Sequence, residues 1–146
     1  MRRMVWLSAF VAAMAGAFAA GRVHGAAPGH GSMIQHDADV AKDEPGTHNG
    51  GGQTIGYSFF AKAPNLPYVF RKRALHPGSG VGLHTQAEDE VYYVLSGKGE
   101  MTLDGEPHAI GPGTAILTRT GSSHSLKQMG AEDLVIIITY PIAPAR

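Results

Sequence analysis

The sequence predicts an all-β fold, an antiparallel sandwich or barrel built from many short strands. After Gly52, alternating runs of apolar and polar residues recur at close spacing, each bounded by residues that favour tight turns, and no segment keeps a helical period. Glycine and proline are frequent, with 20 and 9 copies among 146 residues. That length suits one domain, and 43% hydrophobic residues are enough for a core. Many closely spaced strands with turn signals are typical of these two architectures.

Eight strands are expected in the folded part of the chain. They are Thr54–Ala61, Tyr68–Leu75, Val81–Gln86, Glu90–Leu95, Glu100–Leu103, Thr114–Thr118, His124–Met129 and Leu134–Tyr140. Asp104 and Gly105 form a hairpin signal, because both residue types tolerate a positive φ. The last run, LVIIITY, is apolar throughout, which is typical of a strand that is covered on both faces or crosses the core.

The first 26 residues have the pattern of a secretory signal peptide. Arg2 and Arg3 precede an uncharged, alanine-rich run over residues 4–21, with small residues at its end. The run is short and weakly apolar for a membrane span, so we expect export, with cleavage after Ala19 or, as we favour, after Gly25. The protein would then be periplasmic or secreted and free of the membrane; an uncleaved anchor is the alternative. Because the chain has no cysteine, its core must stabilise the exported domain without disulfides.

Residues 27–52 are expected to form a flexible arm rich in glycine and histidine, followed by a single domain over residues 53–146. Its histidines, His30, His36 and His48, are irregularly spaced, and we interpret them as solvated linker residues rather than metal ligands. Twelve basic residues balance twelve acidic ones, without a basic stripe. This balance argues against nucleic-acid binding.

Side chains that can bind a metal gather in the segment GLHTQAEDEVYYVLSGKGE, residues 82–100. In an extended strand, His84 and Gln86 share a face. We expect a turn through residues 87–89 to reverse the chain, so that Glu90 begins an antiparallel partner strand beside them. An imidazole, an amide oxygen and a carboxylate suit a divalent metal, and His124, which opens a late strand, is the obvious second imidazole.

Two segments of the chain resemble the motifs of the cupin superfamily. The first motif, Gly-x5-His-x-His-x3–4-Glu-x6-Gly, is similar to the pattern of Gly78, His84, Gln86, Glu90 and Gly97. The second is similar to GPGTAILTRTGSSHSLKQ, with its glycine at Gly113, its histidine at His124 and Gln128 where the family usually has asparagine. The resemblance covers residues 57–140. It implies a single antiparallel jelly-roll β-barrel with one metal inside, and a homodimer as the default assembly.

Gln86 departs from the family pattern, because a second histidine usually stands at this position. The resemblance implies that His84, Gln86, Glu90 and His124 hold the metal. An amide oxygen is a harder donor than imidazole, which favours Fe(II) or Mn(II), with Zn(II) and Ni(II) as alternatives. In a second interpretation Gln86 does not ligate, and the other three residues form a facial triad with open positions.

For function, the resemblance implies a metalloenzyme that acts on a small organic molecule, either as a dioxygenase or as an isomerase or lyase. Glu90 would act as the base, and in the isomerase or lyase case Tyr92 or Glu90 would move the proton. Tyr92 has the same parity as Glu90 and is expected to point into the barrel; the alternative is an aromatic core residue. A non-catalytic cupin that binds a small ligand, a sugar or a metal is the alternative function.

A run of three basic residues, RKR, occupies residues 71–73. Such a run is typical of the wet face or rim of an outer sheet, and this is the interpretation we favour. The alternative is that Lys72, or the two arginines on the opposite face of the strand, contacts an anionic ligand.

Overall fold

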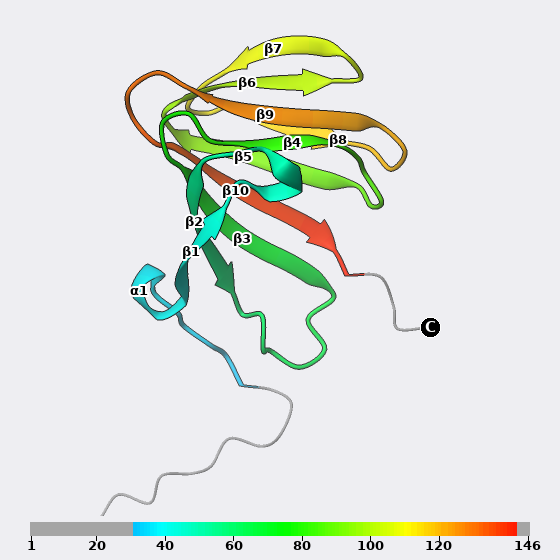
Figure 1. The fold of residues 1–146 in the computed structure, drawn as a ribbon. Coiled ribbons are helices and arrows are strands. Elements are labelled where there is room, and N and C mark those ends of the chain that lie inside the picture. The colour runs from blue at the N-terminus through cyan, green and yellow to red at the C-terminus, as the bar shows by residue number, and fades with distance from the viewer. Residues whose placement is uncertain (1–30, 143–146) are drawn as a thin grey trace, which may run out of the picture. The chain divides into compact units, whose positions relative to one another are not determined.

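The structure is a computed structural model that describes residues 31–142. These residues form ten strands and two short helical turns (Figure 1). The strands are β1 (Ala41–Pro45), β2 (Gln53–Phe59), β3 (Tyr68–Leu75), β4 (Gly80–Thr85), β5 (Glu90–Ser96), β6 (Lys98–Leu103), β7 (Glu106–Ile110), β8 (Ala115–Thr118), β9 (Ser123–Met129) and β10 (Leu134–Pro141). The helical turns are α1 (Asp37–Val40) and η1 (Thr47–Asn49).

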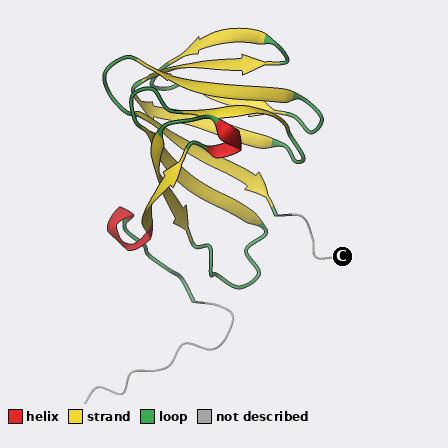
Figure 2. Ribbon diagram, in the orientation of Figure 1, coloured by secondary structure: helices red, strands yellow, loops and turns green. Residues whose placement is uncertain are grey.

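The strands form two antiparallel sheets, which confirms the predicted all-β jelly-roll fold (Figure 2). The six-stranded sheet has the order β1-β2-β3-β10-β5-β8, and the four-stranded sheet has the order β4-β9-β6-β7. Consecutive strands repeatedly change sheet, as from β4 to β5 and from β8 to β9. Among residues 31–142, no helix is long and apolar enough to cross a membrane.

The core is built from alternate residues of strands in both sheets. On β10, Leu134 and Ile136 are fully buried, while Val135 and Ile137, which alternate with them, are only half-buried. The apolar run LVIIITY therefore alternates in exposure, although its strand lies between β3 and β5. Period-two burial of this kind is expected of a strand with one face on the core. The other fully buried aliphatic side chains are Leu75, Val94, Met101 and Leu126.

The N-terminal part of the described chain corrects one expectation. Residues 37–49 were expected within an arm without regular structure, but they include α1, β1 and η1. Strand β1 pairs antiparallel with β2, from Ala41 opposite Tyr57 to Pro45 opposite Gln53. Its residues are polar because the strand lies at the sheet edge and is held by backbone pairing rather than by an apolar face. The expected signal peptide, residues 1–26, lies outside the described residues.

The hairpin expected around Gln86 is also wrong. Strand β4 pairs with β9, whereas β5 pairs with β10 and β8 in the other sheet. Beyond the end of β4, the backbone N–H of Gln86 donates to the backbone carbonyl of Ser122, at 2.8 Å, and keeps this segment beside the start of β9. Residues 87–89 therefore carry the chain from one sheet to the other. His84 and Glu90 come from different sheets.

The η1 turn packs on β4 through glycine. A Cβ on Gly82 would collide with the carbonyl oxygen of His48, and one on Gly50 would collide with that of Gly80. His48 itself has a left-handed backbone, with φ of 51°. This close backbone approach fixes the position of the His48 side chain relative to β4.

Candidate functional site

A pocket of about 250 Å³ lies between residues of both sheets and of η1. Its wall mixes basic, acidic, amide and aromatic side chains with a few aliphatic ones. The lining residues are Thr47, His48, Arg71, Arg73, Val81, His84, Thr85, Gln86, Ala87, Glu88, Glu90, Tyr92, Ile138 and Tyr140. Three of the four expected metal ligands are therefore in the wall, and the fourth, His124, contacts His84 and Tyr92.

His84 and His124 are direct partners in the pairing of β4 with β9. Opposite residues of an antiparallel pair bring their side chains together, and the two ring centroids lie 4.2 Å apart in an edge-on arrangement. The second imidazole therefore comes from the strand adjacent to that of His84. Nδ1 of His84 lies 2.9 Å from the carbonyl oxygen of Gly82, which can only accept. Nδ1 therefore carries the proton, and Nε2 keeps its lone pair for a ligand.

His124 is completely buried. Its Nε2 lies 2.9 Å from the hydroxyl of Tyr92, and its Nδ1 has no hydrogen-bond partner among residues 31–142. Burial, together with the nearby His84 and His48, lowers the pKa of His124 to about 4. The ring is consequently neutral at pH 7, which is the form that binds a metal.

Gln86 and Glu90 are both buried and bonded to each other. The Gln86 amide nitrogen donates to Oε2 of Glu90 at 3.0 Å, which leaves the amide oxygen of Gln86 as the available donor atom. Oε2 of Glu90 also lies 3.7 Å from Nε2 of His124. Burial raises the pKa of Glu90 above its ordinary value. A carboxyl group in this environment is a stronger base than an exposed one.

Tyr92 is buried, with 3% of its surface exposed, and its hydroxyl bonds His124. Burial and the adjacent Glu90 carboxylate raise its pKa well above the ordinary phenol value. The hydroxyl therefore stays protonated across the physiological range, so it can donate a hydrogen bond or a proton but cannot serve as a base. Both sequence interpretations of Tyr92, core aromatic and wall of the site, describe part of its position.

His48 was not predicted as part of the pocket, and Arg71 and Arg73 were considered for a ligand only in the alternative interpretation of the RKR run. The rings of His48 and His84 are stacked, with centroids 3.6 Å apart and an angle of 5° between the planes. Arg71 and Arg73 also line the pocket, and Arg73 is only 2% exposed, so the sheet-rim interpretation is wrong for it. The two arginines share parity with the apolar Leu75 on one strand, which is a signal that this face is internal. His48 reaches the site through a long-range contact that no local pattern reveals.

The atoms that could bind a metal lie close together, but they are hydrogen-bonded to one another or to Tyr92. Within the described part of the chain, no three His, Asp or Glu side chains converge as a ready metal site. A metal at these residues would replace the bond between Tyr92 and His124. The ligand types do suit a metal: two imidazoles, one carboxylate and one amide oxygen.

The chain is similar to one protein-family model and to several known proteins. The family model described as "Cupin domain" matches residues 72–140. An oxalate-binding protein from Thermotoga maritima is 39% identical over 71 residues, which is 48% of this chain and 59% of that protein. An L-ectoine synthase from Hahella chejuensis is 29% identical over 83 residues, or 56% of this chain and 63% of that protein. The chain thus covers less than two thirds of either relative.

Solved structures share the fold over a larger part of the chain. A predicted oxalate decarboxylase from Thermotoga maritima has a TM-score of 0.67 and 27% identity, over 75% of this chain and 99% of that one. The polyketide cyclase RemF from Streptomyces resistomycificus has a TM-score of 0.63 and 20% identity, over 75% and 79% of the two chains. KdgF from Halomonas sp. has a TM-score of 0.62 and 21% identity, over 79% of this chain and 97% of that one. The last two similarities concern the fold alone. Family match and shared fold together support the cupin superfamily for this chain.

Proposed function

We propose that this pocket binds one divalent metal ion through His84, Gln86, Glu90 and His124, and that the protein acts there on a small organic molecule. The observation that carries the proposal is the meeting of two imidazoles from paired strands with a buried carboxylate and a buried amide. Buried polar groups of this kind are costly unless they are matched by partners, so their gathering at one pocket indicates a ligand.

The donor set favours Fe(II) or Mn(II), with Zn(II) and Ni(II) as alternatives. Carboxylate and amide oxygens suit the harder ions, while imidazole accepts all four. Nδ1–H of His84 donates a hydrogen bond to the Gly82 carbonyl, which orients the ring and leaves Nε2 free. This is the orienting contact that metal-binding histidines use.

A bound metal would supply Lewis-acid activation or open positions for a substrate of a dioxygenase, isomerase or lyase. The chain's own residues supply the proton transfers. Glu90, whose pKa is raised by burial, would accept a proton, and the Tyr92 hydroxyl, which stays protonated, would donate one or hold a developing negative oxygen. The aliphatic Val81 and Ile138 in the wall would limit the entry of water.

Ligand binding without catalysis is the second candidate function. It is supported by the similarity to a protein that is named for binding oxalate. Turnover of candidate substrates, measured under air and under argon with Fe(II) or Mn(II), separates the two. Consumption that needs air favours the dioxygenase, consumption under both gases favours the isomerase or lyase, and tight binding without consumption favours the binding protein.

Metal content is the first test of the proposal. Protein purified without a histidine tag should take up about one equivalent of Fe(II) or Mn(II), and His124→Ala should lose it. His108→Ala is the matched control, because His108 is exposed on β7. Gln86→His should tighten binding, since imidazole is a stronger donor for most of these ions. Uptake below roughly a tenth of an equivalent, for every transition metal tried, would contradict the metal site.

We also propose that the protein is exported and cleaved, on the basis of the basic, apolar and small-residue pattern of residues 1–26. Expression in a bacterial host followed by N-terminal sequencing of the periplasmic fraction tests this. The expected new N-terminus is Ala26, or Ala20 for the earlier cleavage site. An intact Met1 in the membrane fraction would show an uncleaved anchor instead.

A further inference from the structure

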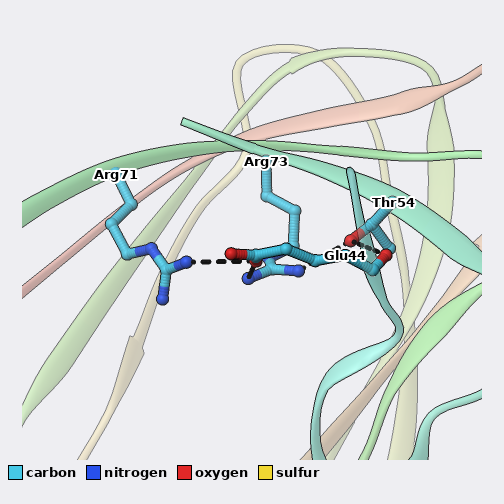
Figure 3. A network of polar contacts seen from close by, with 4 residues as sticks. All are labelled: Glu44, Thr54, Arg71 and Arg73. Carbon is cyan, nitrogen blue, oxygen red and sulfur yellow. Dashed lines mark hydrogen bonds and ion pairs between the residues drawn. The ribbon is translucent and has the colours of Figure 1, made fainter. Parts of the chain in front are cut away.

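The pocket contains two guanidinium groups that share a single carboxylate. Oε2 of Glu44, on β1, lies 2.8 Å from Nη2 of Arg73 and 3.3 Å from Nη2 of Arg71 (Figure 3). Nη1 of Arg73 donates a second hydrogen bond, of 2.7 Å, to the hydroxyl of Thr54. One carboxylate thus serves two guanidinium groups at this part of the wall.

Arg71 is the arginine that remains incompletely bonded. Among residues 31–142, only its Nη2 has an acceptor, through the longer of the two bonds to Glu44, and its buried Nε has none. Arg73, in contrast, is almost completely buried and makes two shorter bonds. A buried donor without an acceptor is unusual in a native protein and indicates a missing partner. Because Arg71 lines the pocket, a molecule within the pocket can be that partner.

Glu44 is held where it is by features of three strands. Glu44 lies on β1, and its side chain extends past Gly56 of β2. Its carboxylate contacts the two arginines of β3. A Cβ on Gly56 would come within 2.5 Å of Oε2 of Glu44, so the carboxylate fits only because residue 56 has no side chain. The backbone carbonyl of Glu44 also accepts a bond of 3.1 Å from the Thr54 hydroxyl. The glycine at position 56 therefore leaves room for the Glu44 carboxylate beside the arginines.

We propose that Arg71 binds a carboxylate group of the molecule that enters the pocket, in competition with Glu44, which Arg73 holds in place. This rests on the proposed function, since it takes the pocket to be the ligand site. The guanidinium offers planar, paired N–H donors that match the two oxygens of a carboxylate, and Arg71 has donors without an acceptor among residues 31–142. Glu90, the other carboxylate near Arg71, accepts a hydrogen bond from Gln86, and no hydrogen bond joins it to Arg71 among residues 31–142. The substrate class is therefore a small organic acid.

Calorimetric titration of the full chain with small diacids and their neutral amides tests this inference. The probes are oxalate and malonate, paired with oxamide and malonamide, in metal-loaded and in chelator-treated protein. Arg71→Met should weaken binding of the diacids about tenfold or more in both preparations, because a charge-assisted hydrogen bond is lost, and should leave any amide binding unchanged. Metal content is measured for each variant and should match wild type.

Lys72→Met is the matched control. It removes the same charge from the adjacent residue, whose side chain pairs with Asp37 and lies over the Tyr57 ring, away from the pocket. It should leave diacid binding unchanged. Glu44→Gln should tighten diacid binding severalfold, because it removes the carboxylate that competes for Arg71, and it tests the inference if Arg71→Met fails to fold.

Three results would overturn the inference: no diacid binding by wild type at roughly 10 mM, wild-type binding by Arg71→Met, or unchanged binding by Glu44→Gln. Each leaves the metal proposal standing when metal uptake is normal. A chain that binds the diacids but takes up no metal gives the reverse result, in which the carboxylate site holds and the metal site fails.

Discussion

His124 is a completely buried base, and its burial couples stability to pH. The pKa of its ring falls from an ordinary 6.5 to about 4 in the folded chain. As the pH drops below about 6.5, the unfolded state binds the proton first, so stability present at neutral pH is lost between pH 6.5 and pH 4. We expect a loss of roughly 2–3 kcal/mol over this range. Urea unfolding at pH 7.5 and at pH 4.5 measures it.

The matching variant is His124→Gln, which keeps a polar side chain of similar size but does not titrate. Its free energy of unfolding should change less between the two pH values than that of wild type. Parallel pH dependence in the two proteins would show that the loss comes from another group.

Tyr92 competes with any metal for Nε2 of His124. In Tyr92→Phe the hydroxyl is gone, which should cost about 1 kcal/mol of stability through the lost hydrogen bond. The same change frees Nε2, so metal affinity should rise severalfold. Tyr93→Phe is the control, because Tyr93 points to the outer face and is 44% exposed. Weaker metal binding by Tyr92→Phe, with Tyr93→Phe unchanged, would mean that the phenol assists the metal instead.

At the scale of elements, η1 depends on the absence of a side chain at Gly82. Gly82→Ala should push η1 away from β4, because the new Cβ meets the carbonyl oxygen of His48. We expect a loss of about 1–3 kcal/mol, the usual cost of forcing atoms into a packed site. Gly111→Ala is the control, since the position has no close contact. Equal unfolding free energies for the two variants would show that η1 moves without cost.

The elements that sequence reasoning missed are those held by polar or backbone contacts. Strand β3 was predicted with its bounds because its residues carry a β-type pattern. Strand β1, AKDEP, and strand β7, EPHAI, have little such pattern, since both lie at sheet edges and are mostly exposed. They are strands because they pair with β2 and β6. For β1, the partner residues are distant in the sequence, so no local pattern predicts the pairing.

Sequence reasoning likewise predicted some features of the site and missed others. The order and spacing of His84, Gln86, Glu90 and His124 predicted a cluster, and the structure brings these four residues together. Their pairing was predicted incorrectly, because a turn that reverses the chain within one sheet and a turn that crosses between sheets look alike in sequence. His48 was assigned to a solvated linker because nothing near it indicates where η1 packs.

At the scale of the whole molecule, the outer face of the six-stranded sheet predicts a homodimer. Val91, Tyr93 and Leu95 on β5 are 39–46% exposed, and Leu117 on the neighbouring edge strand β8 is 51% exposed. A contiguous apolar patch on a sheet edge is a liability unless it is covered, and a second copy of the chain would cover it.

Leu117→Glu should therefore shift the protein towards the monomer in sedimentation or light-scattering measurements. Met129→Glu is the control, because Met129 is similarly exposed, at 48%, on a strand of the other sheet. A monomeric wild-type protein at all concentrations tested would contradict the dimer. So would a Leu117→Glu protein that keeps its mass.

The contact of Glu44 with Arg71 and Arg73 bears on how such proteins diversify. The matched cupin domain starts at residue 72, so the strand that carries Glu44 and the turn that carries His48 lie upstream of it. The expected metal ligands lie inside the matched domain. Under the proposed function, exchange of the upstream segment would alter which molecule is admitted, while the proposed metal ligands stay unchanged. Chimaeras that swap residues 41–52 between relatives would separate inheritance of chemistry from inheritance of specificity.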